Sequence, residues 1–154
     1  MIFCIDERIT QALIARIQTI TTAKGYQYNM GERIERIRSS GVDVAPYPLT
    51  LLLENLPDLD SDYSRVRSDR LNYALLYLDG IDDTEPETDP IFKRLANCHA
   101  DLIKCLAEDQ ELNGLCEGIS VVDHDITDTD LGWGFVAFIE VQRDIDAENP
   151  YEKP

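Results

Sequence analysis

Two amphipathic helical segments, with strand-like segments between and after them, leave this chain of 154 residues few possible folds. The first helix is expected from about Asp6 to Ala23, because apolar residues recur there at helical spacing. Asp6 is the expected N-cap, and Lys24-Gly25 is a typical exit from a helix. The apolar stripe of this helix consists of Ile5, Ile9, Ala12, Leu13, Ile17 and Ile20.

The second helix has the clearer start, with Asp89 as N-cap and Pro90 at the first helical position. Proline suits that position because the N–H that it lacks would have no partner within the helix. The helix is expected to run to about Asp109. Its expected buried stripe consists of Ile91, Leu95, Cys98, Leu102, Cys105 and Leu106.

The remaining segments are typical of β-strands, since apolar residues alternate or cluster in them between turn-forming residues. The polar segment 55–70 is expected to be a loop, and the acidic segment 123–130 a turn between two strands. The order of elements predicts an α+β fold: an antiparallel or mixed β-sheet of about five strands covered by two α-helices. We expect a single domain over residues 1–146, followed by a C-terminal tail at 147–154. The expected strands are 33–38, 49–54, 71–80, 118–122 and 132–143.

The strands at 71–78 and 133–141 have apolar residues on both faces. Two helices on one face of the sheet would not bury all of them. Their aromatic residues are of the types enriched at the centres of protein interfaces, although a well-packed core would use the same types. These residues are Tyr73, Tyr77, Trp133, Phe135 and Phe138.

The formal net charge of −16 is unevenly distributed along the chain. Residues 1–70 carry 9 Lys or Arg against 10 Asp or Glu, whereas residues 71–154 carry 5 against 20. Since nucleic-acid binding depends on Lys and Arg, this balance argues against ordinary DNA or RNA binding. It favours solubility, or a surface that DNA passes without sticking. The arginines that could face the acidic half of a neighbouring copy are Arg33, Arg36, Arg38, Arg65, Arg67 and Arg70.

Two acidic clusters invite a metal-binding interpretation. The first, at 58–69, has the spacing of a calcium-binding loop, but Tyr63 stands where such a loop needs glycine. The second, at 123–130, could hold a divalent ion in a nuclease, yet the region 105–142 contains no Lys or Arg to hold phosphate. We therefore expect no metal site and no cofactor. The clusters consist of Asp58, Asp60, Asp62 and Asp69, and of Asp123, His124, Asp125, Asp128 and Asp130.

No motif for nucleophilic catalysis is found, and no catalytic residue is predicted. Cys98 and His99 are adjacent, but neighbouring residues of a helix diverge by about 100° and cannot form a dyad. The motifs GxxxxGK[ST], GxGxxG and GxSxG are absent. The four cysteines match no common zinc spacing and are expected to act as small buried hydrophobes. The sequence also lacks the apolar segment of a membrane span and the features of a signal peptide, so we expect the protein in the cytoplasm where it is made.

The first forty residues resemble the opening of bacteriophage tail terminator and minor tail (tail completion) proteins. In that family an amphipathic helix with a short Thr-rich exit is followed by a Gly-Tyr pair and a strand. The ending 138–151 is similar to the closing strand of the family, except that Asp144-Ile145 stands where the family often has threonine. The matching parts of the opening are Ala12-Leu13, Arg16-Ile17, Ile20-Thr21, Gly25-Tyr26 and Gly31.

The resemblance implies a structural protein of the virion tail, assembled in the cytoplasm of the bacterial host. It implies a homohexameric ring that caps the tail tube and offers a docking face to the head completion and connector proteins. It implies no catalysis and no cofactor, and the acidic second half would line a channel through which DNA slides. Two other readings remain. An acidic DNA mimic would inhibit a host nuclease or restriction enzyme, and a metal-dependent nuclease would be centred on residues 123–130.

Overall fold

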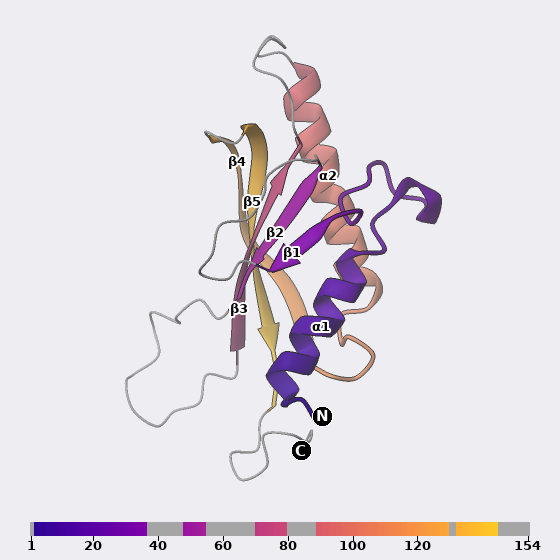
Figure 1. The fold of residues 1–154 in the computed structure, drawn as a ribbon, viewed down its shortest axis with the longest axis vertical. Helices are drawn as coiled ribbons and strands as arrows, with labels where there is room; N and C mark the ends of the chain where they lie inside the picture. The colour runs from indigo at the N-terminus through magenta and orange to yellow at the C-terminus, as the bar shows by residue number, and fades with distance from the viewer. Residues whose placement is uncertain (1, 37–47, 55–69, 80–88, 130–131, 145–154) are drawn as a thin grey trace.

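A computed structural model describes residues 2–36, 48–54, 70–79, 89–129 and 132–144, without the side chains of 89–91 and 127–129. Figure 1 shows two helices on one side of a twisted sheet. The elements in chain order are α1 (Ile5–Ile17), the 3₁₀ helix η1 (Thr22–Lys24), β1 (Ile34–Arg36), β2 (Leu49–Leu53), β3 (Arg70–Leu78), α2 (Asp89–Glu108), β4 (Gly118–Thr129) and β5 (Gly132–Gln142).

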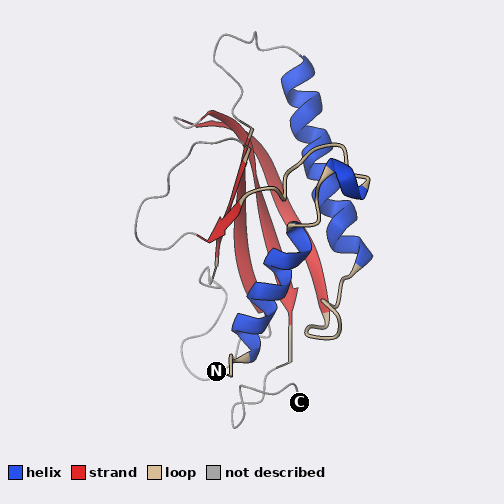
Figure 2. Ribbon diagram, turned by 45° about the vertical axis from the view of Figure 1, so that its right-hand side comes forward, coloured by secondary structure: helices blue, strands red, loops and turns tan. Residues whose placement is uncertain are grey.

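The sheet is mixed, with the strand order β1-β2-β3-β5-β4. β1 runs parallel to β2, and the other three pairs are antiparallel. Both α1 and α2 lie against the same face, as the rotated view in Figure 2 also shows. This arrangement confirms the predicted α+β fold, with a mixed sheet of five strands and two helices.

The first helix is shorter than predicted and begins differently. α1 ends at Ile17, where the Thr19 hydroxyl donates a hydrogen bond to the carbonyl of Arg16 at 2.6 Å. The chain then turns so that the backbone of Gly31 lies directly against the carbonyl of Ile17, where a Cβ atom would come within 2.1 Å. The predicted exit at Gly25 is found with φ +93°, but it ends η1 instead of α1.

The predicted N-cap of the first helix was also wrong. Cys4 occupies that position and makes no side-chain capping bond. Asp6 lies inside the first turn, where its carboxylate accepts hydrogen bonds from the Arg143 guanidinium just beyond β5. The side chain therefore ties the helix to the sheet, a long-range role that local spacing does not reveal.

The second helix agrees with its prediction closely, since α2 ends at Glu108. Five members of its predicted stripe are buried; the side chain of Ile91 lies outside the described residues. The buried members are Leu95, Cys98, Leu102, Cys105 and Leu106.

The acidic segment expected as a turn is a strand. β4 continues from Gly118 to Thr129, and its register with β5 is unbroken except for a bulge between Val121 and Asp123. Long backbone pairing to β5 outweighs the turn preference of single aspartates, because an edge strand can turn those side chains to solvent. β4 ends at Thr129 and β5 begins at Gly132, and residues 130–131 lie outside the described residues.

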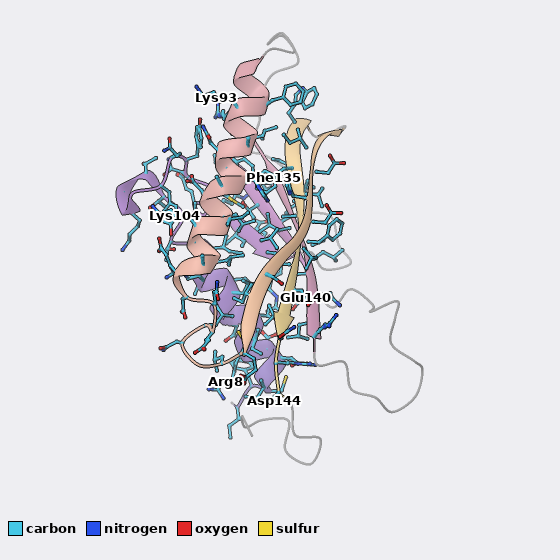
Figure 3. The ribbon with its side chains drawn as sticks, turned by 180° about the vertical axis from the view of Figure 1, so that it is seen from behind. Arg8, Lys93, Lys104, Phe135, Glu140 and Asp144 are labelled. Carbon is cyan, nitrogen blue, oxygen red and sulfur yellow. The ribbon has the colours of Figure 1, made fainter. Side chains whose placement is uncertain are left out.

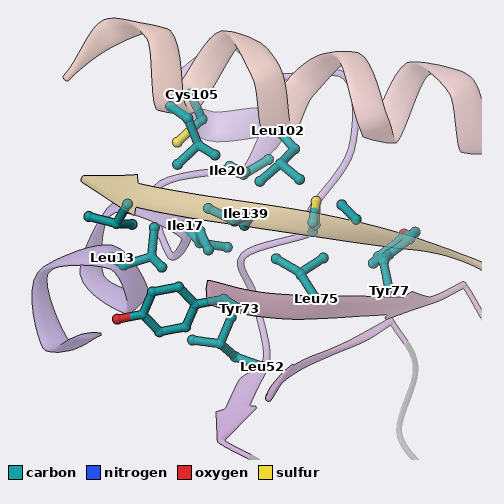
Figure 4. Packing of buried hydrophobic residues seen from close by; sticks show 14 of the residues in the cluster. Leu13, Ile17, Ile20, Leu52, Tyr73, Leu75, Tyr77, Leu102, Cys105 and Ile139 are labelled. Atoms are coloured by element: carbon teal, nitrogen blue, oxygen red, sulfur yellow. The ribbon is translucent and has the colours of Figure 1, made fainter. Parts of the chain in front are cut away.

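The core lies between the helices and one face of the sheet (Figure 4). Tyr73, Tyr77 and Phe135 are at most 1% exposed there, so these three aromatic residues belong to the core and not to an interface. The Tyr73 hydroxyl shares a 2.8 Å hydrogen bond with Thr10 of α1, and burial raises the pKa of this phenol to about 12. Three of the four cysteines, Cys98, Cys105 and Cys116, are buried and free, as predicted, and Cys4 is half-buried.

Candidate assembly surfaces

The sheet has a second apolar face, on the side opposite α1 and α2, which we call the outer sheet face. This face exists because successive side chains of a strand point to opposite sides of the sheet. The strand register places Leu51, Leu76 and Val136 in one row across the sheet, and Leu53, Ala74 and Phe138 in the next. The outer sheet face consists of Leu49, Leu51, Leu53, Ala74, Leu76, Leu78, Val136 and Phe138.

Exposure of this face increases from one end to the other. Leu49, Leu51 and Leu78 are buried, whereas Leu53 and Phe138 are 37% and 39% exposed. Both α1 and α2 lie on the opposite side of the sheet, where the main core cluster is found. A sheet face with exposed leucine and phenylalanine side chains is a typical place for another protein surface to pack.

Carboxylates border the exposed end of the outer sheet face. Asp123 is paired in register with Phe138, and Asp125 with Val136, and both aspartates are exposed. Val122, at the bulge of β4, adds an apolar side chain that is 57% exposed. The β4 edge of the face is therefore apolar with an acidic border.

α2 carries a second apolar stripe, here called the outer helix stripe, on its solvent side. Phe92 and Ile103 are 43% and 46% exposed, and the three alanines of the stripe are exposed too. Phe92 packs edge-on against Trp133 of β5, with ring centroids 5.7 Å apart. The stripe follows helical spacing over Phe92, Ala96, Ala100, Ile103 and Ala107.

A groove of about 190 Å³ continues the outer helix stripe toward β4. Ile103 and Ala107 form its helix side, and Ile119 and Val121 form its strand side. Lys93 and Lys104 lie on the side of α2 away from β4 (Figure 3). The helix surface therefore combines an apolar stripe, a groove and a basic border.

Three of the arginines expected to face a neighbouring copy are described by the structure, and each of them is paired with a carboxylate of its own chain. Arg36 pairs with both Glu7 and Glu54, Arg33 with Glu35, and Arg70 with Glu140. An arginine already neutralised by a carboxylate adds little free positive charge to a surface. For Arg33, Arg36 and Arg70 contact with the acidic half of a neighbouring copy stays a prediction; Arg38, Arg65 and Arg67 lie outside the described residues.

The acidic clusters do not form a metal site in the part of the chain that the structure describes. Asp58, Asp60, Asp62 and Asp69 lie outside it, as do Asp130 and the side chain of Asp128. Within β4, Asp123 and Asp125 are on the outer sheet face, whereas His124 is on the helix side. Alternation along a strand thus separates the imidazole from the carboxylates that the sequence placed beside it.

The two histidines meet across the α2–β4 contact, which sequence reasoning missed. The rings of His99 and His124 stack with centroids 3.7 Å apart, and His99 also contacts Phe135 edge-on. Nε2 of His99 is buried and makes no hydrogen bond in the structure. Burial lowers the pKa of His99, and the nearby positive charge of His124 lowers it further. Assigning residues 123–130 to a turn hid this pairing, because only strand alternation turns His124 toward α2.

Cys98 and His99 diverge as predicted. Cys98 points into the core near Tyr77, and burial raises the pKa of its thiol to about 12. The thiol is therefore protonated at neutral pH. This geometry does not support a Cys–His dyad.

The sequence matches no known protein family and no curated protein. Among the helices that the structure describes, none is both long and apolar enough to span a membrane. The functional argument therefore depends on the surfaces of the chain itself.

Proposed function

We propose that this chain is a structural assembly protein: a ring-forming tail terminator or tail completion subunit of a bacteriophage, with no catalytic role. The observation that supports this most strongly is the outer sheet face. Its exposed end brings Leu53 and Phe138 together in one row of the sheet, and adjoining exposed apolar side chains favour a contact with another protein surface.

The proposed partners are further copies of the chain, six in a closed ring, together with the tail tube protein and the head completion or connector protein. Identical subunits that meet through different surfaces form a ring when the rotation between them closes. The two apolar surfaces on opposite sides of the molecule, the outer sheet face and the outer helix stripe, suit such an arrangement.

The proposed channel would be lined by carboxylates at the end of the molecule where the α2–β4 connection meets the end of β5. Glu111, Glu117 and Asp144 are exposed there, and Glu117 and Asp144 border a shallow depression that Arg70 and Arg143 also line. Negative side chains repel the phosphates of DNA and let it slide. Such a channel requires that Glu111, Glu117 and Asp144 face the axis of the ring.

The test is to mix the purified protein with isolated tail tubes and locate it by immunogold electron microscopy. We expect label at one end of each tube only, and the protein should also be present in assembled virions. Label along the whole tube, or absence from virions, would overturn the proposal. Tight binding of the monomer to a basic nuclease or restriction enzyme would instead support the DNA-mimic alternative.

A further inference from the structure

The molecule offers two apolar surfaces of complementary kind, each with exposed members: Leu53 and Phe138 on the outer sheet face, and Phe92 and Ile103 on the outer helix stripe. One is a sheet face that has no helix on it among the described elements, and the other is a helix with an apolar stripe turned to solvent. We propose that the outer helix stripe of one copy packs on the outer sheet face of the next, so that each sheet becomes covered by helices on both faces. This inference rests on the proposed ring and specifies the contact that builds it.

The shapes of the two surfaces fit one another. The 20 residues of α2 span about 30 Å, and the 11 residues of β5 span about 35 Å, so the helix can lie along the strands. The exposed alanines Ala96, Ala100 and Ala107 allow the helix backbone to approach the sheet closely. Phe138 projects from the sheet, and the groove beside Ile103 offers a recess for a projecting side chain.

The charges of the two surfaces are also complementary. Lys93 and Lys104 border the outer helix stripe, and neither lies within ion-pair distance of a carboxylate that the structure describes. The Lys104 ammonium also lies over the ring of Tyr26, 4.9 Å from its centroid. Asp123 and Asp125 border the outer sheet face. Opposite charges at the rim of an interface steer association and fix its register.

The same charges disfavour a two-fold contact between two outer sheet faces. In such a dimer each surface meets an identical copy of itself, and when the two-fold axis runs across the strands the aspartates of one β4 lie near those of the other. Like charges brought together across an interface oppose association. A helix-to-sheet contact avoids this repulsion and leaves a free surface at each end, which permits a ring.

A complementation experiment distinguishes these arrangements. Ile103→Asp damages the helix surface, Phe138→Asp damages the sheet surface, and Ile2→Asp makes the same change at a residue that is 80% exposed and belongs to neither surface. Mass by light scattering after size exclusion is measured for the wild type, each variant and an equimolar mixture of the two damaged variants. Circular dichroism checks folding, and Ala100→Glu replaces Ile103→Asp if that variant misfolds.

We expect the wild type and Ile2→Asp to form the same ring, and each damaged variant alone to be monomeric. Their mixture should give a heterodimer, because one copy retains an intact helix surface and the other an intact sheet surface. A ring that persists in both damaged variants would overturn this contact and leave the ring itself standing. Loss of assembly only in Phe138→Asp, without rescue on mixing, would favour the two-fold contact and overturn the inference. A monomeric wild type would overturn both the inference and the proposed function.

Discussion

Arg36 connects three elements of the fold through two carboxylates. From β1 its guanidinium donates two hydrogen bonds to Glu7 of α1, at 2.7 and 2.8 Å, and two more to Glu54 just after β2, both at 2.7 Å. The three side chains are largely buried. The carboxylates raise the pKa of Arg36 above its already high usual value, so the side chain is always charged. β1 has only three residues, and these bonds compensate for its short backbone pairing.

We predict that Arg36→Ala lowers the free energy of unfolding by about 2 kcal/mol, since it leaves two partly buried carboxylates without their partner. Arg36→Lys should recover less than half of this loss, because an ammonium group cannot bind both carboxylates in a bidentate manner. Urea denaturation measures both values. Arg8→Ala is the control: Arg8 is exposed on α1, and its loss should change stability by less than about 0.5 kcal/mol. Equal effects of Arg36→Ala and Arg8→Ala would contradict the role given to Arg36.

The stacked histidines are expected to make the folded protein less stable as the pH falls. In the folded state the pKa of His99 lies below its ordinary value of about 6.5, first because of burial and second because of the charge on His124. The unfolded chain therefore binds more protons in this range, so the free energy of unfolding falls as pH drops below about 6.5. This loss of stability is complete once the pH has fallen below the pKa of His99 in the folded protein.

We predict that His99→Gln reduces the difference in stability between about pH 7.5 and about pH 5, because the substituted residue does not titrate in this window. His124→Gln should reduce the difference by less, since burial of His99 would remain. Urea denaturation of the three proteins at both pH values measures this. If the stability of the wild type and that of His99→Gln change by the same amount between the two pH values, the role given to His99 is refuted.

At the scale of elements, the close contact between β3 and β5 depends on a glycine. A Cβ atom at Gly134 would lie 2.0 Å from the carbonyl oxygen of Tyr77, a backbone atom that cannot easily move. At Gly118 in β4, by contrast, no atom lies within 4 Å of such a Cβ. The two glycines thus belong to neighbouring strands but have very different surroundings.

Gly134→Ala should therefore destabilise the protein by about 2 kcal/mol or more, through forced separation of β3 and β5. Gly118→Ala, the matched control, should be neutral or slightly stabilising, because it restricts the unfolded chain without a clash. Thermal unfolding of both variants checks this difference. If Gly134→Ala and Gly118→Ala have similar melting temperatures, the Tyr77 carbonyl does not exclude a side chain at position 134.

The outcomes for α1, α2 and β4 show which parts of the fold can be predicted from the local sequence. α2 was predicted well because Pro90 marks its start and its apolar stripe has helical spacing throughout. The end of α1 was missed because it is set by Gly31, a residue distant in sequence that packs on Ile17. β4 was predicted too short because its aspartates prefer turns locally, whereas pairing with β5 decides their conformation.

The candidate surfaces were only partly predictable for the same reason. The sequence indicated apolar residues on both faces of two strands, and the outer sheet face is the result. It could not separate Phe138, which is exposed, from Phe135 and Tyr77, which belong to the core. That distinction depends on which face the helices cover, and this is a property of the tertiary structure.

At the scale of the whole molecule, we propose that the chain works by assembling with copies of itself. The apolar surfaces lie on opposite sides, and Arg33, Arg36 and Arg70 are paired with carboxylates of the same chain. Assembly should therefore depend on apolar contact, with charge contributing mainly to orientation and rate.

The most direct measurement is the native mass of the purified wild-type protein, recorded over a range of concentrations from low to high micromolar. We predict one discrete species of six copies of the 17.5 kDa chain, with no larger species as concentration rises, because a ring closes on itself. A monomer across the whole range, or a broad distribution of masses that grows with concentration, would contradict a closed ring.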